Sequence, residues 1–116
     1  MQRAISSRHF VKRIFRPEEI DYAEGKGNDL ARAASYASAF AAREAFCKAA
    51  GHTIAAVALS SGFCLTRQDG VPSLRIDASL DPNFLPGGGK KAWVSLSHDG
   101  DYAVAVVVVE SVAPEA

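Results

Sequence analysis

Glu44 and Lys48 are the residues of this sequence whose types and spacing are best suited to chemistry on an anionic substrate. They lie four positions apart in the stretch FAAREAFCKAAG, and residues four apart share one face of an α-helix. A carboxylate can hold a metal cation, and an ammonium can stabilise phosphate charge. A solvated ion pair on a helix surface explains the same spacing, so the pair leaves both interpretations open.

His98 is the second candidate. It ends the segment WVSLSH, in which strand alternation places His98 on the same face as Val94 and Leu96. A histidine at a strand tip, near a carboxylate and an ammonium, suits phosphate and metal chemistry. The alternative is a turn histidine that caps the HDGD hairpin together with Asp99.

The helix that must position the first pair is the clearest predicted element. Asn28 or Asp29 can cap its start, residues 30–50 contain neither Gly nor Pro, and Gly51 follows where a terminal glycine is expected. Its expected length of about 30 Å makes it the central strut of the fold. Two shorter helices are expected before it, at residues 6–15 and 16–25.

Beyond this helix the pattern changes to short β-leaning runs separated by turn signals. The runs are TIAAVALS, FCLTR and SLRI, followed by the loop DPNFLPGGGKK and a hairpin formed by WVSLS and YAVAVVVVE. Because the last run is apolar at both alternating sets of positions, we expect a strand buried on both faces. The fold class is α+β, with a long central helix packed on a mostly antiparallel sheet, and residues 1–116 are expected to form one domain.

Composition narrows the range of functions. The 13 basic residues balance 13 acidic ones, which argues against a general nucleic-acid binder. Residues 1–16 nevertheless carry Arg and Lys and no acid, so this segment is either a patch for an acidic macromolecule or an ordinary solvated helix face.

The two cysteines, Cys47 and Cys64, match no disulfide framework or zinc pattern, and Cys47 is expected to be a small buried hydrophobe. We expect a cytoplasmic protein without a signal peptide or membrane span.

Taken together, these segments resemble the 4′-phosphopantetheinyl transferase superfamily. The stretch FAAREAFCKAAG resembles its signature helix, aromatic-x-x-(Lys/Arg)-Glu-Ala-x-x-Lys, with matches at Phe40, Arg43, Glu44, Ala45 and Lys48. The segment RHFVKRIFRPEEIDY resembles the part between the first two helices of the family, DGVPSLRI its Gly-x-Pro turn and strand, and WVSLSHDGDYAVAVVVVE its closing hairpin. The resemblance covers residues 8–110 and is closest to the short, holo-acyl-carrier-protein-synthase type.

The resemblance implies an enzyme that transfers the 4′-phosphopantetheine arm of coenzyme A to a serine of an acyl-carrier protein, as in fatty acid biosynthesis. It implies Mg²⁺ as cofactor, with Glu44 as a catalytic residue and metal ligand. Lys48 corresponds to the catalytic lysine beside the phosphates, and Arg43 and His98 correspond to positions at the coenzyme A site.

The resemblance also implies two kinds of protein partner. The short type forms a homotrimer whose active sites lie between subunits. Acidic carrier proteins dock on the basic first helix of the family, beside an aromatic residue. The positions of this sequence that fit this role are Arg8, Phe10, Lys12 and Arg13.

Three departures from the family pattern bear on activity. The family opens with a strand carrying Gly-x-Asp, whose Asp is a second metal ligand, and alignment would place it before Met1. We therefore expect either a start upstream of Met1 or a protein without this ligand. Ala39 stands where the family usually has Arg, and the glycine-rich loop after the helix reads GHTIAAV, in which His52 either compensates or is simply exposed. The alternative function is a non-catalytic or incomplete relative that binds carrier protein or coenzyme A, completed by a partner chain.

Overall fold

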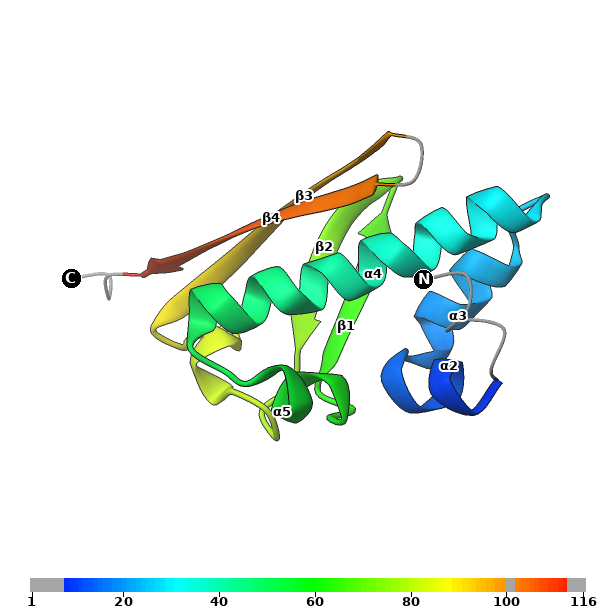
Figure 1. Cartoon of the computed structure of the whole chain (residues 1–116). Coiled ribbons are helices and arrows are strands. Elements are labelled where there is room, and N and C mark those ends of the chain that lie inside the picture. The colour runs from blue at the N-terminus through cyan, green and yellow to red at the C-terminus, as the bar shows by residue number, and fades with distance from the viewer. Residues whose placement is uncertain (1–7, 100–101, 113–116) are drawn as a thin grey trace.

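Helices come first along the chain and strands follow. The computed structural model describes residues 8–99 and 102–112, and for Arg8 and His9 only the backbone. The helices are α2 (Arg8–Ile14), α3 (Pro17–Glu24), α4 (Asp29–Ala50) and α5 (Ile54–Ala58), with a 3-10 turn at Pro82–Phe84. The strands are β1 (Phe63–Gln68), β2 (Val71–Ile76), β3 (Lys90–Asp99) and β4 (Tyr102–Ser111). Figure 1 shows α4 across the middle of the molecule, so the predicted α+β class with a long central helix is confirmed.

Both ends of α4 are set by local sequence. The Asn28 side chain accepts a hydrogen bond from the backbone N–H of Ala31 at 2.8 Å, which caps the first turn. Gly51 ends the helix in the left-handed conformation, with φ of 79°, where a side chain would be strained. Along its buried side α4 presents Tyr36 and Phe46 to a core that also contains Phe15, Phe63 and several alanines of α4 itself.

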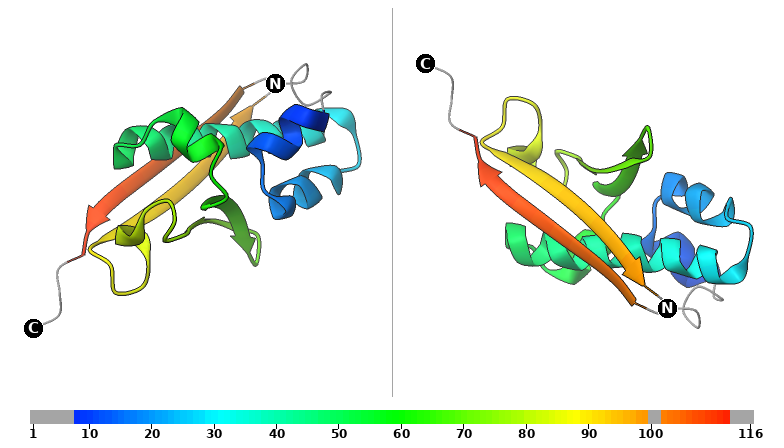
Figure 2. Two further views of the ribbon diagram at one scale, coloured as in Figure 1. Left: turned by 90° about the horizontal axis from the view of Figure 1, so that it is seen from below. Right: turned by 90° about the horizontal axis from the view of Figure 1, so that it is seen from above.

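The strands form two separate antiparallel hairpins, β1–β2 and β3–β4. The β3–β4 hairpin crosses α4 diagonally, as Figure 2 shows in its right-hand view, and β4 packs along the helix. Only one face of β4 is covered. Val104, Val106 and Val108 are each more than half exposed, while Ala105 and Val107 turn toward the helix. The prediction of a strand buried on both faces was therefore wrong, because α4 covers a single side of this hairpin.

A second prediction was wrong at TIAAVALS, where a β-leaning run was expected. Residues Ile54–Ala58 form the short helix α5 instead, and the hydroxyl of Thr53 accepts a hydrogen bond from the N–H of Ala56 at 3.1 Å. Three alanines favour the helical turn once this cap is in place. Within the part of the chain that the structure describes, no helix has the length and apolar character needed to cross a membrane.

Candidate functional site

Arg43 lies inside the protein, beneath the helix face that carries the other motif charges. Its side chain is 2% exposed and forms a two-pronged ion pair with Glu19 of α3, in which Nη1 donates to Oε2 at 2.6 Å. Glu19 also accepts hydrogen bonds from the N–H groups of Arg16 and of Leu65 in β1. The resemblance implied a place for Arg43 at the coenzyme A site, but this structure gives its guanidinium a carboxylate partner and no access to solvent.

In contrast to the buried Arg43, Glu44 and Lys48 are accessible to solvent. Glu44 is half-buried and Lys48 is exposed on the same side of α4. Neither side chain forms a hydrogen bond or ion pair with another described residue, so the surface ion pair considered from the spacing is not formed. An unpaired carboxylate and an unpaired ammonium on one helix face are free to engage a ligand that carries both a metal ion and phosphate charge.

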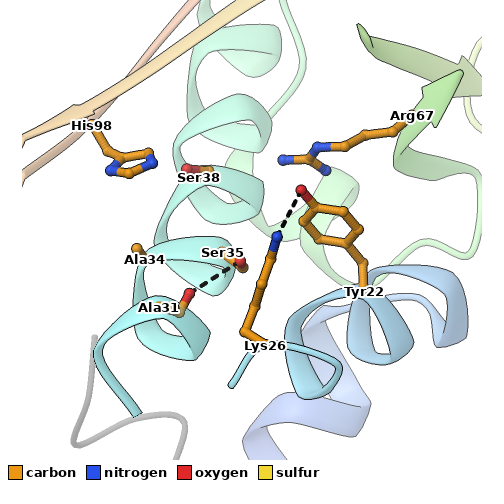
Figure 3. Close-up of a pocket in the computed structure, with 8 residues that line it drawn as sticks. All are labelled: Tyr22, Lys26, Ala31, Ala34, Ser35, Ser38, Arg67 and His98. Carbon is orange, nitrogen blue, oxygen red and sulfur yellow. Dashed lines mark hydrogen bonds between the residues drawn. The ribbon is translucent and has the colours of Figure 1, made fainter. Parts of the chain in front are cut away.

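His98 lies near the end of β3, with its side chain facing the N-terminal half of α4. It lines a pocket of about 150 Å³ together with Ser35 and Ser38 of α4, as Figure 3 shows. No hydrogen bond links His98 to Asp99 or to another described residue, and because residues 100–101 of the turn lie outside the described residues, a capping role there stays a prediction. Ser38 precedes Glu44 by six residues, which corresponds to a rise of about 9 Å along the helix. Six residues also turn the helix by about 240°, so Ser38 and Glu44 face directions about 120° apart, and the pocket lining includes neither Glu44 nor Lys48.

The far wall of this pocket holds residues that the sequence patterns did not single out. Tyr22 and Lys26 come from the end of α3 and the turn after it, and Arg67 comes from β1. The four-residue spacing of Tyr22 and Lys26 is a signal that could have indicated contact between them. Arg67 carries no such local signal, because only the packing of β1 beside α3 brings it here.

The loop after α4 gives His52 a structural partner. Its Nε2 lies 2.7 Å from a carboxylate oxygen of Asp81, and its ring stacks on Phe46 with centroids 5.8 Å apart. Burial raises the pKa of Asp81, but hydrogen bonds from His52 and from the N–H of Asn83 outweigh this effect and hold the pKa below its ordinary value of 3.8. In this structure His52 is therefore engaged in holding the loop near α4.

The Asp81 interactions predict a pH-dependent contribution to stability. A carboxyl group with a lowered pKa in the folded state stabilises the fold above its ordinary value of 3.8, and this contribution is lost as the pH falls through the lower folded value. We expect Asp81→Asn to lower the free energy of unfolding by about 1–3 kcal/mol at neutral pH. In urea denaturation the gap between variant and parent should shrink below the ordinary carboxyl value. A gap that stays constant over this range would contradict the assignment to the ionised carboxylate.

The predicted carrier-docking residues are only partly described. Lys12 and Arg13 are exposed on the last turn of α2, whereas Phe10 is half-buried and its ring meets that of Phe15 edge-on at 6.3 Å. The side chain of Arg8 lies outside the described residues. The docking role of all four stays a prediction, and Lys12 and Arg13 are the two whose charges are open to a partner.

A metal site is not preformed by the described residues. No group of three His, Cys, Asp or Glu side chains among them could hold a cation. Glu44 contributes a single free carboxylate. Magnesium is commonly bound by one or two carboxylates together with substrate phosphates and water, so this donor set fits a magnesium ion that arrives with an anionic substrate.

Comparisons with known proteins agree with the resemblance. Residues 1–107 match the family model described as the 4′-phosphopantetheinyl transferase superfamily. A holo-[acyl-carrier-protein] synthase of Geotalea daltonii is 34% identical over 112 residues, covering 94% of this chain and 87% of the relative. The synthase of Geobacter metallireducens is 39% identical over 109 residues, covering 87% and 79%, and that of Treponema denticola is 30% identical over 110 residues, covering 95% and 88%. The chain belongs to the 4′-phosphopantetheinyl transferase superfamily, as a transferase of the holo-acyl-carrier-protein synthase type.

Proposed function

We propose that this protein transfers 4′-phosphopantetheine from coenzyme A to a serine of an acyl-carrier protein in a magnesium-dependent reaction. The observation that carries the proposal is the pair of unpartnered charges, Glu44 and Lys48, on one side of α4. The serine Oγ–P bond forms as the P–O bond to the nucleotide breaks. The hydroxyl proton is released, and adenosine 3′,5′-bisphosphate leaves.

Each of the two residues has a distinct task in this proposal. The ammonium of Lys48 lies against the pyrophosphate and stabilises the charge that develops as the P–O bond breaks. The carboxylate of Glu44 would hold magnesium, which would supply positive charge to neutralise the pyrophosphate. Because both side chains project from one helix, their points of attachment are fixed before the substrate arrives.

Mass spectrometry of carrier proteins tests the proposed reaction. The protein is incubated with coenzyme A, MgCl₂ and a panel of apo-carriers, including those encoded nearby, and each carrier is weighed. We expect one carrier to gain the mass of the phosphopantetheine arm, and the gain to disappear when EDTA replaces magnesium. No gain with any carrier would contradict the proposed function.

The second candidate is a non-catalytic or incomplete relative. It is favoured by one observation, namely that no group of three metal-ligating side chains lies among the described residues. Calorimetry distinguishes the two candidates. Coenzyme A binding that is independent of magnesium, with carrier binding intact and no transfer, would identify the incomplete relative. Activity restored by a partner chain would show how the site is completed.

We also propose that three copies assemble through the exposed face of the β3–β4 hairpin. This face, called here the valine face, consists of Trp93, Tyr102, Val104, Val106 and Val108, each between 52% and 79% exposed. Cross-strand pairing places Trp93 opposite Val108 and Asp99 opposite Tyr102, so the apolar side chains form one continuous surface. An exposed apolar surface of this kind is typical of a protein interface. A second copy of the same chain is the proposed occupant, since its own valine face offers the same chemistry.

A charge placed in the centre of the valine face should disrupt the assembly. We expect Val106→Asp to shift the protein from trimer to monomer in sedimentation equilibrium, because a carboxylate would be buried without a partner. The matched control is Val71→Asp on the β1–β2 hairpin, where the side chain is 63% exposed outside this face. A parent protein that sediments as a monomer would refute the proposed trimer.

The proposal also includes how the carrier protein docks and in which cellular compartment the reaction takes place. Lys12 and Arg13 offer positive charge to an acidic carrier. Cys47 and Cys64 are buried and unpaired, which is compatible with a reducing compartment, and we place the reaction in the cytoplasm.

A further inference from the structure

The carboxylate of Glu19 joins three elements of the fold at one buried point. Its side chain is 2% exposed. Oε1 accepts a hydrogen bond from the N–H of Arg16 at 2.7 Å, at the start of α3. Oε2 accepts one from the N–H of Leu65 in β1 at 3.1 Å. Each oxygen also accepts an N–H of the Arg43 guanidinium, so α4 is tied to the same group.

The guanidinium of Arg43 is held in one orientation. Besides its two bonds to Glu19, Nη1 donates to the carbonyl of Ala39 at 3.1 Å, one turn earlier in α4. The ring centres of Phe15 and Phe63 lie 5.2 and 5.0 Å from the guanidinium carbon. A planar group with two parallel bonds to a carboxylate has a defined direction as well as a defined place. The pair therefore fixes which side of α4 faces α3 and β1.

The apolar packing just before Arg43 on α4 is less directional. The buried residues there are Ala39 and Ala42, whose methyl groups give the helix only shallow ridges to interlock with its neighbours. Apolar groups in place of a buried ion pair are often neutral or stabilising, so the charges are not needed to fill this space. What the ion pair adds is a specific orientation, which methyl groups do not supply.

Glu44 follows Arg43 directly, and successive residues of a helix point about 100° apart. With Arg43 directed at Glu19, Glu44 lies at the half-buried border of α4, and Lys48 lies one turn further along the same side. We infer that the Glu19–Arg43 pair fixes the rotation of α4 about its axis and thereby the direction of the Glu44 carboxylate. Glu19 and Arg43 are positioning residues, because both are buried away from any substrate. The inference rests on the proposed function for the role of Glu44.

The double variant Glu19→Leu, Arg43→Met separates orientation from stability. It leaves no charge buried, so it should fold with a urea midpoint above that of Glu19→Ala. We expect its kcat for arm transfer to fall by at least about tenfold, because small misplacements of a reacting group are costly. KM for the carrier should stay within about threefold of the parent, because Lys12 and Arg13 of α2 are unchanged.

Two single variants accompany this measurement. Leu65→Ala is the control for lost stability, because it removes a core side chain that is 3% exposed but keeps the N–H that Glu19 binds. It should keep most of the parent's kcat at temperatures where it is folded. Arg43→Lys keeps a cation near Glu19 but loses the two-pronged geometry, so its kcat should fall by about threefold or more, to a value above that of the double variant. Parent-like kcat in Arg43→Lys or in the folded double variant would overturn the inference.

Spin labels report the rotation of α4 without requiring transfer. Nitroxides are attached at Lys48→Cys and Val71→Cys, two exposed positions, in the parent and in the double variant. The native Cys47 and Cys64 are buried, and burial raises the pKa of both thiols, which disfavours their labelling. We expect a narrow distance distribution in the parent and a broader or displaced one in the double variant.

The labels and the transfer assay have separate outcomes. Identical distance distributions in the parent and the double variant would overturn the inference, whatever the transfer assay shows. If no carrier gains the phosphopantetheine arm, the proposed function fails, and the distance distributions still decide whether the buried pair orients α4.

Discussion

Glu44→Gln and Lys48→Met should each lower kcat for arm transfer by about 10²-fold or more while leaving the fold intact. Glutamine keeps the size of the side chain but removes the negative charge that holds magnesium, and methionine keeps the apolar stem of lysine but removes the ammonium. Stability should change little, since neither charged group contacts a described partner and Lys48 is exposed. The rate of mass gain by the carrier measures the first effect, and the thermal unfolding midpoint measures the second.

Asp29→Asn is the control for this pair of variants. Asp29 is an exposed carboxylate on the first turn of the same helix, where it faces Arg32 at 3.5 Å. Removing its charge should leave the transfer rate within about twofold of the parent, because exposed pairs of this kind contribute little. Full activity of Glu44→Gln with magnesium would remove Glu44 from the reaction. Equal loss in all three variants would point to a general effect of charge on α4 and not to a site.

The largest effect on stability should follow from breaking the buried pair of Glu19 and Arg43. Both side chains are 2% exposed, and Arg43 also lies 5.2 and 5.0 Å from the ring centres of Phe15 and Phe63. Glu19→Ala leaves the guanidinium buried without a counter-charge and leaves the N–H of Leu65 without its acceptor. We expect a loss of about 3–5 kcal/mol in the free energy of unfolding, measured by urea denaturation.

Glu18→Ala supplies a control one residue away. Glu18 pairs with Arg75 at 2.6 Å, but both side chains are more than half exposed, so the loss should stay below about 1 kcal/mol. The double variant Glu19→Leu, Arg43→Met should recover part of the loss, because two apolar groups replace two charges in the same space. If Glu19→Ala costs no more than Glu18→Ala, the buried pair makes no net contribution to the fold.

Several features with a local signal were predicted correctly from the sequence. The caps at Asn28 and Gly51 gave the limits of α4, and the four-residue spacing correctly placed Glu44 and Lys48 on one side of it. The β3–β4 hairpin followed from a turn signal between two β-leaning runs. These features depend on hydrogen bonds and side-chain directions within a few residues, which a pattern can capture.

Apart from α5, whose Thr53 cap is local, the main features that were missed depend on partners far along the chain. Arg43 was grouped with Glu44 and Lys48, yet its burial is decided by Glu19, which lies 24 residues away. The exposed valine face could not be distinguished from a buried strand, because composition does not say how many layers cover a sheet. The convergence of Lys26 and Arg67 on Tyr22 likewise requires α3 and β1 to pack side by side, which no local pattern encodes.

The separation of the strands into two hairpins has a mechanical consequence. Among the described residues, β1–β2 and β3–β4 share no ladder of backbone hydrogen bonds, so only side-chain packing resists a shear of one hairpin past the other. Arg67 belongs to the first hairpin and His98 to the second, and they stand on facing walls of the same pocket. The distance between these walls can therefore adjust without breaking any strand pairing. A ligand that contacts both walls would add a non-covalent link between two hairpins that are otherwise joined through the shared hydrophobic core.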